Sequence, residues 1–222
     1  MQTIISLTGN AGVGKDTMAD YLVDKYGFVK IGLADPMKRI AKEVYEFTDE
    51  QLWGSSDERN LPDERYPRPD GSFLSARVAL QLLGNEWSRV CYPDTWTVYL
   101  RRIIEKVSKG YFYSETRGAY RVAGKQSAYN GIVISNGRFR NEIEGIKTMG
   151  GKAVRLRRAA LDTAKSLQLG VPNHASELEQ MSIPDEMFDA VVEVPEGFED
   201  FYREIDICLA RLKALPMKVE AI

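Results

Sequence analysis

Cysteine and histidine are scarce in this chain of 222 residues, which contains two cysteines and one histidine. Cys91 and Cys208 are too few for a disulfide framework and lie too far apart for the paired spacing of a zinc site. A lone histidine cannot supply the imidazole set that many metal sites use. We therefore expect a protein of a reducing, cytoplasmic compartment without a disulfide framework or a zinc site.

Long apolar runs and an excess of one charge are also missing. No stretch approaches the roughly 20 apolar residues that span a bilayer, and the first ten residues lack the basic start of a secretion signal. Lys and Arg total 30 against 32 Asp and Glu, so a net charge of -2 gives no general attraction to polyanions. We expect neither nucleic acid nor a membrane as a partner. The hydrophobic content of 44% suffices for the core of one domain over residues 1–222.

Strands and helices are expected to alternate along the chain. Short apolar runs predict strands over 3–8, 28–33, 131–135, 153–156 and 190–194. Apolar residues at helical spacing predict helices over 16–26, 36–47, 75–90, 95–106, 140–149 and 198–213. This alternation predicts an α/β fold with a doubly wound parallel sheet, whose ligands bind at the carboxyl ends of the strands.

Three further segments have their own expectations. Residues 54–73 are dense in Pro, Gly, Asp and Arg without a clear period, which predicts a long surface excursion. Residues 111–123 alternate around Arg117-Gly118 and indicate a hairpin. Asp94 is expected to cap the helix that follows it.

A glycine-rich loop follows the first expected strand. The segment GNAGVGKDT matches G-x-x-x-x-G-K and lies between a strand and a helix, as a P-loop requires. Glycines allow tight backbone turns that point successive amides at phosphate oxygens, and Lys15 would reach the β- and γ-phosphates of ATP. The expected ATP-binding residues are Gly9, Asn10, Ala11, Gly12, Val13, Gly14, Lys15, Asp16 and Thr17.

Asp16 occupies the place where this motif usually carries a Ser or Thr that binds Mg²⁺. Its carboxylate could hold Mg²⁺ through water or act near the acceptor. The alternative is a carboxylate in the first turn of a helix, favoured there by the helix dipole. Thr17 can still donate to the α-phosphate.

Further segments, in their order and spacing, resemble the deoxynucleotide monophosphate kinases of bacteriophages, within the nucleoside monophosphate kinase group. Besides the loop, they are ADPMKRIAKEVY (34–45), QLWG (51–54), RVALQLLGNEWSR with PDTW (77–96), SNGRFRNEIEGIKTMGGKAVRLRR (135–158) and HASELE (174–179).

The resemblance covers about residues 1–200. It implies a transfer of phosphoryl groups from ATP, with Mg²⁺, to deoxynucleoside monophosphates, on a core sheet of about five strands. It also implies a helical monophosphate-binding insertion at about 34–105 and a lid at about 157–177, while the hairpin at about 108–130 would be an additional insertion. A phage-encoded enzyme of this kind would work in the host cytoplasm.

Candidate acceptor-binding residues lie between the second strand and the PDTW segment. Arg77 and Gln81 fall four apart on one helix face, and with Arg89 they could bind the phosphate and the base. Asp35 and Lys38 lie where an acceptor phosphate could be reached, and the resemblance adds Trp96. The alternatives are a solvated helix face and an Asp-Pro pair that only starts a helix.

The segment after the expected strand 131–135 departs from the family pattern. Asn136 stands where the resemblance favours Asp, so the acidic role would pass to Asp16 or Glu142, or phosphates and water would hold the metal. Arg138 is expected at the transferring phosphate or the acceptor. A surface arginine is the alternative.

The expected lid carries the last candidates. Arg155, Arg157 and Arg158 precede it and could bring guanidinium groups over the phosphates, or they form an ordinary charged strand end. The resemblance places His174, Ser176 and Glu177 near the acceptor, and an anchoring role for His174 is favoured over acid-base chemistry. We expect Lys15, Asp16, Arg138, Arg157 and Arg158 to carry catalysis.

Other functions stay open on the sequence alone. The loop and fold fit other small-molecule kinases, similar to dephospho-coenzyme A kinase or phosphomevalonate kinase, and the RVALQLLG segment favours the nucleotide acceptor. A P-loop binding or motor protein would need a basic stripe or an extra domain. The aromatic residues at 111–113 and Tyr120 could stack on single strands, but a packed hairpin or a subunit contact in a homodimer is favoured.

Overall fold

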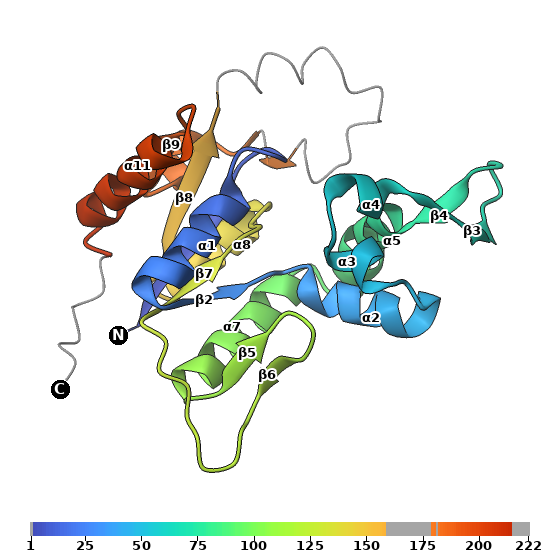
Figure 1. Cartoon of the computed structure of the whole chain (residues 1–222), viewed down its shortest axis with the longest axis horizontal. Coiled ribbons are helices and arrows are strands. Elements are labelled where there is room, and N and C mark those ends of the chain that lie inside the picture. Colours follow the sequence, from blue (N-terminus) through green and yellow to red (C-terminus); the bar gives the residue numbers. More distant parts are fainter. Residues whose placement is uncertain (1, 159–178, 181, 215–222) are drawn as a thin grey trace.

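Five parallel strands form the centre of the computed structural model, which describes residues 2–158, 179–180 and 182–214. They are β1 (Thr3–Thr8), β2 (Phe28–Ile31), β7 (Gly131–Ile134), β8 (Lys152–Arg157) and β9 (Ala190–Glu193), in the spatial order β2-β7-β1-β8-β9 (Figure 1). The direction of winding reverses at β1, whose neighbours are β7 and β8. The predicted doubly wound sheet is confirmed, and β1 marks the switch point where such folds bind ligands.

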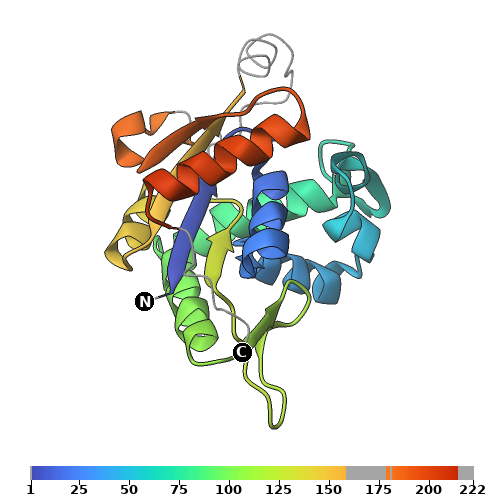
Figure 2. The ribbon, with the colours of Figure 1, turned by 60° about the vertical axis from the view of Figure 1, so that its left-hand side comes forward.

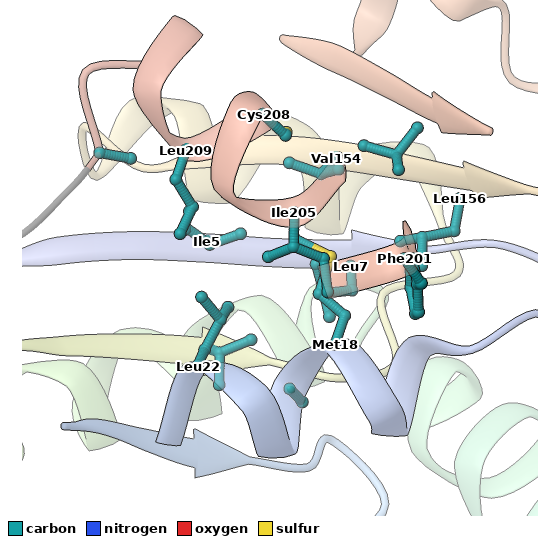
Figure 3. Close-up of a cluster of buried hydrophobic side chains, with 14 of the residues drawn as sticks. Ile5, Leu7, Met18, Leu22, Val154, Leu156, Phe201, Ile205, Cys208 and Leu209 are labelled. Carbon is teal, nitrogen blue, oxygen red and sulfur yellow. The ribbon is translucent and has the colours of Figure 1, made fainter. Parts of the chain in front are cut away.

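Helices cover both faces of this sheet (Figure 2). On one face, α1 (Lys15–Tyr26) and α11 (Phe198–Arg211) pack on the strands through apolar side chains such as Met18 and Ile205 (Figure 3). On the other face, α7 (Thr95–Ser108) and α8 (Arg140–Thr148) pack against the opposite side chains of the strands. Side chains of a strand alternate between faces, so Ile4 belongs to one layer and Ile5 to the other.

An insertion between β2 and α7 stands to one side of the sheet (Figure 1). It begins with α2 (Asp35–Tyr45) and surrounds a small core of its own, made of Ala41, Phe47, Leu52, Ala76 and Ala79. Its other elements are α3 (Asp49–Trp53), α4 (Ser56–Asn60), β3 (Pro62–Pro67), β4 (Phe73–Ser75), α5 (Ala76–Leu82), a π-helical turn (Leu83–Trp87) and α6 (Ser88–Cys91).

Residues 54–73 are more ordered than their composition predicts. The Ser55 hydroxyl and the Glu58 side chain form a capping box that starts α4. Beyond it, β3 and β4 pair antiparallel, with Asp63 opposite Leu74. The segment is an exposed excursion, but local capping and pairing give it regular structure.

The helix expected over 75–90 is present over 76–91 and contains the π-helical turn, where the Gly84 carbonyl accepts hydrogen bonds from Trp96 Nε1 at 2.8 Å and Ser88 Oγ at 2.7 Å. Another expectation about the helices is wrong. Asp94 does not cap α7 with its side chain, because its carboxylate accepts from Asn141 Nδ2 at 2.8 Å instead.

The expected hairpin is present as β5 (Phe112–Ser114) and β6 (Gly118–Tyr120). Tyr113 is buried and the Phe112 ring stacks on Tyr120, with 5.8 Å between ring centroids. These contacts favour the packed-hairpin interpretation over a row of rings open to single strands. Among the described residues, no helix is long and apolar enough to cross a bilayer.

Candidate active site

The loop between β1 and α1 has the backbone shape that phosphate binding requires. Gly9, Gly12 and Gly14 have φ values of 152°, 78° and 109°, which side-chain-bearing residues rarely adopt. A Cβ added at Gly9 would lie 2.5 Å from the Leu156 carbonyl oxygen, so this position also lacks space for a side chain. The loop leads directly into α1, whose first N–H groups have no partner within the helix and favour an anion.

The Lys15 side chain lies over this loop. Its Nζ donates to the carbonyl oxygens of Gly9 at 2.7 Å and Asn10 at 2.8 Å. The ammonium group is therefore held at the mouth of the loop, where the phosphates of a nucleotide would lie.

Asp16 is exposed and forms an ion pair with Lys30 of β2, with 3.0 Å between the charged atoms. Lys30 also contacts Asp20 at 2.9 Å. Burial lowers the pKa of Lys30, but the charge of Asp16 and the hydrogen bonds to both carboxylates outweigh it and raise the pKa above its usual value. Lys30 thus stays charged, and Asp16 has a cationic partner as well as the first-turn position that the helix dipole favours.

A cavity of about 530 Å³ extends from this loop into the insertion. Its floor is made of segments that follow the carboxyl ends of β1, β2 and β7, as expected for a sheet of this type. The predicted residues that line it are Ala11, Gly12, Lys15, Asp16, Asp35, Lys38, Arg77, Gln81, Trp96, Arg138 and Glu142. The loop and the insertion therefore share one cavity.

The insertion contributes a cationic wall to the cavity, made of Lys38, Arg59 and Arg77. Burial lowers the pKa of Lys38, against the attraction of nearby carboxylates. The Arg59 Nε and the Trp53 Nε1 are buried without a hydrogen-bond partner among the described residues. The three cationic side chains make this end of the cavity suited to an anionic group.

Asp35 lies buried at the floor of the cavity. Its Oδ2 accepts from the Gly32 backbone N–H at 2.9 Å and from the Tyr113 hydroxyl at 2.7 Å. Burial raises the pKa of Asp35, while these two hydrogen bonds oppose the shift. The carboxylate thereby ties the start of α2 to the β5–β6 hairpin.

Glu142 and Arg89 are engaged with each other. Glu142 is 4% exposed, its Oε1 lies 2.9 Å from Arg89 Nη2, and its Oε2 accepts from the backbone N–H groups of Arg138 at 2.8 Å and Phe139 at 3.1 Å. The Arg89 guanidinium also lies 3.4 Å above the Phe139 ring. Arg89 is absent from the residues lining the cavity, so the structure places it beside the segment that carries Arg138.

Asn136 joins two of the segments beneath the cavity. Its Oδ1 accepts from the Leu33 backbone N–H at 2.8 Å. The segment after β7 is thus held to the segment after β2 by a hydrogen bond of the Asn136 side-chain amide. This contact does not require a bound metal.

The arginines at the end of β8 contact Asp185 of the 3₁₀ turn Asp185–Met187. Arg155 is 8% exposed and donates to Asp185 at 2.6 Å, and Arg157 donates to the same oxygen at 2.7 Å. Arg155 is a structural residue in this arrangement. The expected lid beyond Arg158, with His174, Ser176 and Glu177, lies outside the described residues.

Several residues of the cavity were not anticipated from the sequence, namely Lys30, Trp53, Arg59, Asn85 and Glu115. Trp53 belongs to the QLWG segment and Arg59 to the arginine-rich excursion, so each had a local signal. Glu115 follows β5 in the hairpin, and no local pattern links it to the loop 100 residues earlier.

Comparisons with known proteins place this chain. It is 31% identical over 206 residues to a protein of Acanthamoeba polyphaga mimivirus whose name assigns it provisionally to the deoxynucleotide monophosphate kinases, covering 93% of this chain and 95% of the relative. No protein-family model matches.

Solved structures with a similar course of the chain include two small-molecule kinases. Shikimate kinase of Aquifex aeolicus has 12% identity and a TM-score of 0.49, covering 95% of this chain and 98% of that one. Dephospho-CoA kinase of Campylobacter jejuni has 13% identity and a TM-score of 0.46, covering 96% and 98%. These likenesses are too remote to bear on the substrate, whereas the mimivirus relative spans nearly the whole chain. The chain belongs to the deoxynucleotide monophosphate kinase family.

Proposed function

We propose that this protein transfers the γ-phosphoryl group of ATP to a deoxynucleoside monophosphate. The observation that carries the proposal is the single cavity that joins the phosphate loop at Lys15 to the cationic wall of Lys38, Arg59 and Arg77. Two phosphorylated ligands could lie end to end in it, one at each end.

The reaction needs positioning and charge more than proton transfer. A phosphate oxygen of the acceptor would form a bond to the γ-phosphorus while the bond from that phosphorus to the β–γ bridging oxygen breaks, releasing ADP. The acceptor phosphate is largely dianionic near pH 7, so a general base contributes little. Lys15 and Arg138 both line the cavity and would stabilise the charge on the transferring group.

Magnesium fits this site with few protein ligands. Mg²⁺ in nucleotide kinases is bound largely by phosphate oxygens and water, and no cluster of three metal-binding side chains occurs in the described part of the chain. Asp16 is the carboxylate at the loop, and we propose that it holds the metal through water. Bound Mg²⁺ would neutralise charge on the β- and γ-phosphates.

The reaction would supply deoxynucleoside diphosphates for DNA synthesis. The resemblance to bacteriophage enzymes makes the host cytoplasm the place where we propose that the protein acts.

A panel of acceptors tests the proposal. With Mg²⁺ and ATP, the protein should convert at least one of dAMP, dGMP, dCMP, dTMP or a modified pyrimidine deoxynucleotide to its diphosphate, measured by chromatography of the products. Addition of excess EDTA should abolish this turnover. Phosphorylation of only dephospho-coenzyme A or phosphomevalonate in the same assay would support the ATP site but contradict the proposed nucleotide acceptor.

Arg77→Ala should act on the acceptor alone. Arg77 lies in the cationic wall, and a charge-assisted contact to phosphate contributes about 1.5–3 kcal/mol, so we expect kcat/KM for the acceptor to fall by about 10- to 150-fold. The KM for ATP should stay within about twofold, because the phosphate loop lies elsewhere in the chain. Arg102→Ala, which removes an exposed arginine of α7, is the matched control. A loss of ATP affinity with normal acceptor kinetics in Arg77→Ala would contradict the assignment.

A further inference from the structure

We infer that Glu115, in the turn of the β5–β6 hairpin, is a specificity-determining residue that accepts a hydrogen bond from the nucleoside part of the acceptor. The inference rests on the proposed function and extends it to an element outside the phosphate loop and the helical insertion. The ligand chemistry is a hydrogen-bond donor, which is either the 3′-hydroxyl of the sugar or an N–H group of the base.

The hairpin is fixed to the floor of the cavity. Tyr113 of β5 donates its hydroxyl proton to the buried Asp35 carboxylate at 2.7 Å. Arg39 of α2 donates from Nη1 to the Glu115 carbonyl oxygen at 2.7 Å and from Nη2 to the Tyr99 hydroxyl at 3.2 Å. The main chain of Glu115 is therefore held by α2, while Glu115 itself lines the cavity.

Glu115 and Lys38 line the same cavity, and the charge of Glu115 acts on Lys38. Asp35 and Glu115 lie close enough to Lys38 to oppose the lowering of its pKa by burial, while Arg59 adds to that lowering. Glu115 also contributes to raising the pKa of Asp35. Asp35, Glu115 and Arg59 all line the cavity together with Lys38, so carboxylates and an arginine both lie near this lysine. A phosphate dianion is repelled by the carboxylates and attracted by the arginines, so the nucleoside part of the acceptor faces the hairpin.

An ionised carboxylate accepts hydrogen bonds and cannot donate them. Its partner must therefore carry an O–H or N–H group, as the sugar and several bases do. A site that binds such a donor discriminates against analogues lacking it, because the half-buried carboxylate of Glu115 then loses that partner. This makes Glu115 a selector among acceptors, in contrast to the arginines, which bind the phosphate that all of them share.

The test compares Glu115→Ala with Glu105→Ala, which removes an exposed carboxylate of α7. For each deoxynucleoside monophosphate that the wild-type protein accepts, kcat and KM are measured for the acceptor and for ATP. We expect Glu115→Ala to raise the acceptor KM by at least about tenfold, the loss typical of a hydrogen bond to a charged group, with the ATP KM unchanged. Glu105→Ala should behave as wild type. Glu115→Met, which keeps the length of the side chain but removes the carboxylate acceptor, is measured in the same way if the alanine variant does not fold.

Acceptors without a 3′-hydroxyl separate the two sources of the donor. If the sugar donates, a 2′,3′-dideoxynucleoside monophosphate should lose activity with the wild type and lose no more with Glu115→Ala. If the base donates, the effect of Glu115→Ala should differ between bases and be the same with and without the 3′-hydroxyl.

Unchanged acceptor kinetics in Glu115→Ala, or equal changes in the KM values of acceptor and ATP, would overturn the inference while leaving the proposed function in place. A wild-type protein that phosphorylates no deoxynucleoside monophosphate overturns both, so the two failures are distinct.

Discussion

Lys15→Ala is expected to lower kcat by at least about a hundredfold while the fold is preserved. The Lys15 ammonium is held at the mouth of the loop by the Gly9 and Asn10 carbonyl oxygens, and it would be aligned with the charge that develops on the transferring phosphoryl group. Removal of a preorganised charged donor from such a site costs about 2.7–4 kcal/mol of transition-state stabilisation. Steady-state kinetics at saturating ATP and acceptor measure the effect.

The control for this prediction is Lys106→Ala, which removes an exposed lysine of α7 that does not line the cavity. Circular dichroism and thermal melting of both variants establish that they are folded. A folded Lys15→Ala protein with nearly normal turnover would remove the loop from the mechanism.

The sequence predicts the sheet well because each strand has a local signal. Apolar runs such as GIVIS mark buried strands regardless of their partners, and all five expected strands are present with boundaries that differ by a few residues. Their spatial order, β2-β7-β1-β8-β9, was not predicted, because the handedness of crossover connections allows several orders in a doubly wound sheet.

Residues 54–73 and the π-helical turn were harder to predict. The Ser55-x-x-Glu58 capping box is visible in the sequence, but the surrounding Pro and Gly residues conceal it. The turn at Leu83–Trp87 keeps helical composition, and it forms where the Gly84 carbonyl serves Ser88 and Trp96. That arrangement depends on tertiary contacts that no sequence window contains.

The site shows the same division between local and distant information. The phosphate loop is a continuous stretch of sequence, so its residues and their contacts within the loop could be predicted together. Arg89 and Glu142 were expected to touch the acceptor; in the structure they form an ion pair across 53 positions of sequence, and Glu142 lines the cavity whereas Arg89 does not. The sequence shows that a residue is charged, but it does not show which residue will pair with it. That pairing decides whether the side chain contacts the ligand or another part of the protein.

Glu142→Ala should destabilise the protein strongly, because the buried carboxylate satisfies three donors at once. Its oxygens pair with the Arg89 guanidinium and accept from the backbone N–H groups of Arg138 and Phe139, at the start of α8. Removing one partner of a buried ion pair costs about 3–5 kcal/mol. For a chain of this length, that corresponds to a fall in Tm of about 6–20 °C, which calorimetry would measure. Activity should fall as well, since the segment that carries Arg138 loses its anchor.

Two variants show whether the ion pair is the cause. Glu144→Ala removes an exposed carboxylate from the same helix and should change stability by no more than about 0.5 kcal/mol. Much of the cost of Glu142→Ala comes from leaving the Arg89 charge without its partner, so adding Arg89→Met to Glu142→Ala should recover part of the lost stability. A double variant no more stable than Glu142→Ala would indicate that the capped N–H groups of Arg138 and Phe139 dominate the loss.

Arg89→Met alone separates the two roles considered for this arginine. A large drop in Tm would support the ion pair with Glu142, whereas a normal Tm with a raised acceptor KM would return Arg89 to the acceptor site.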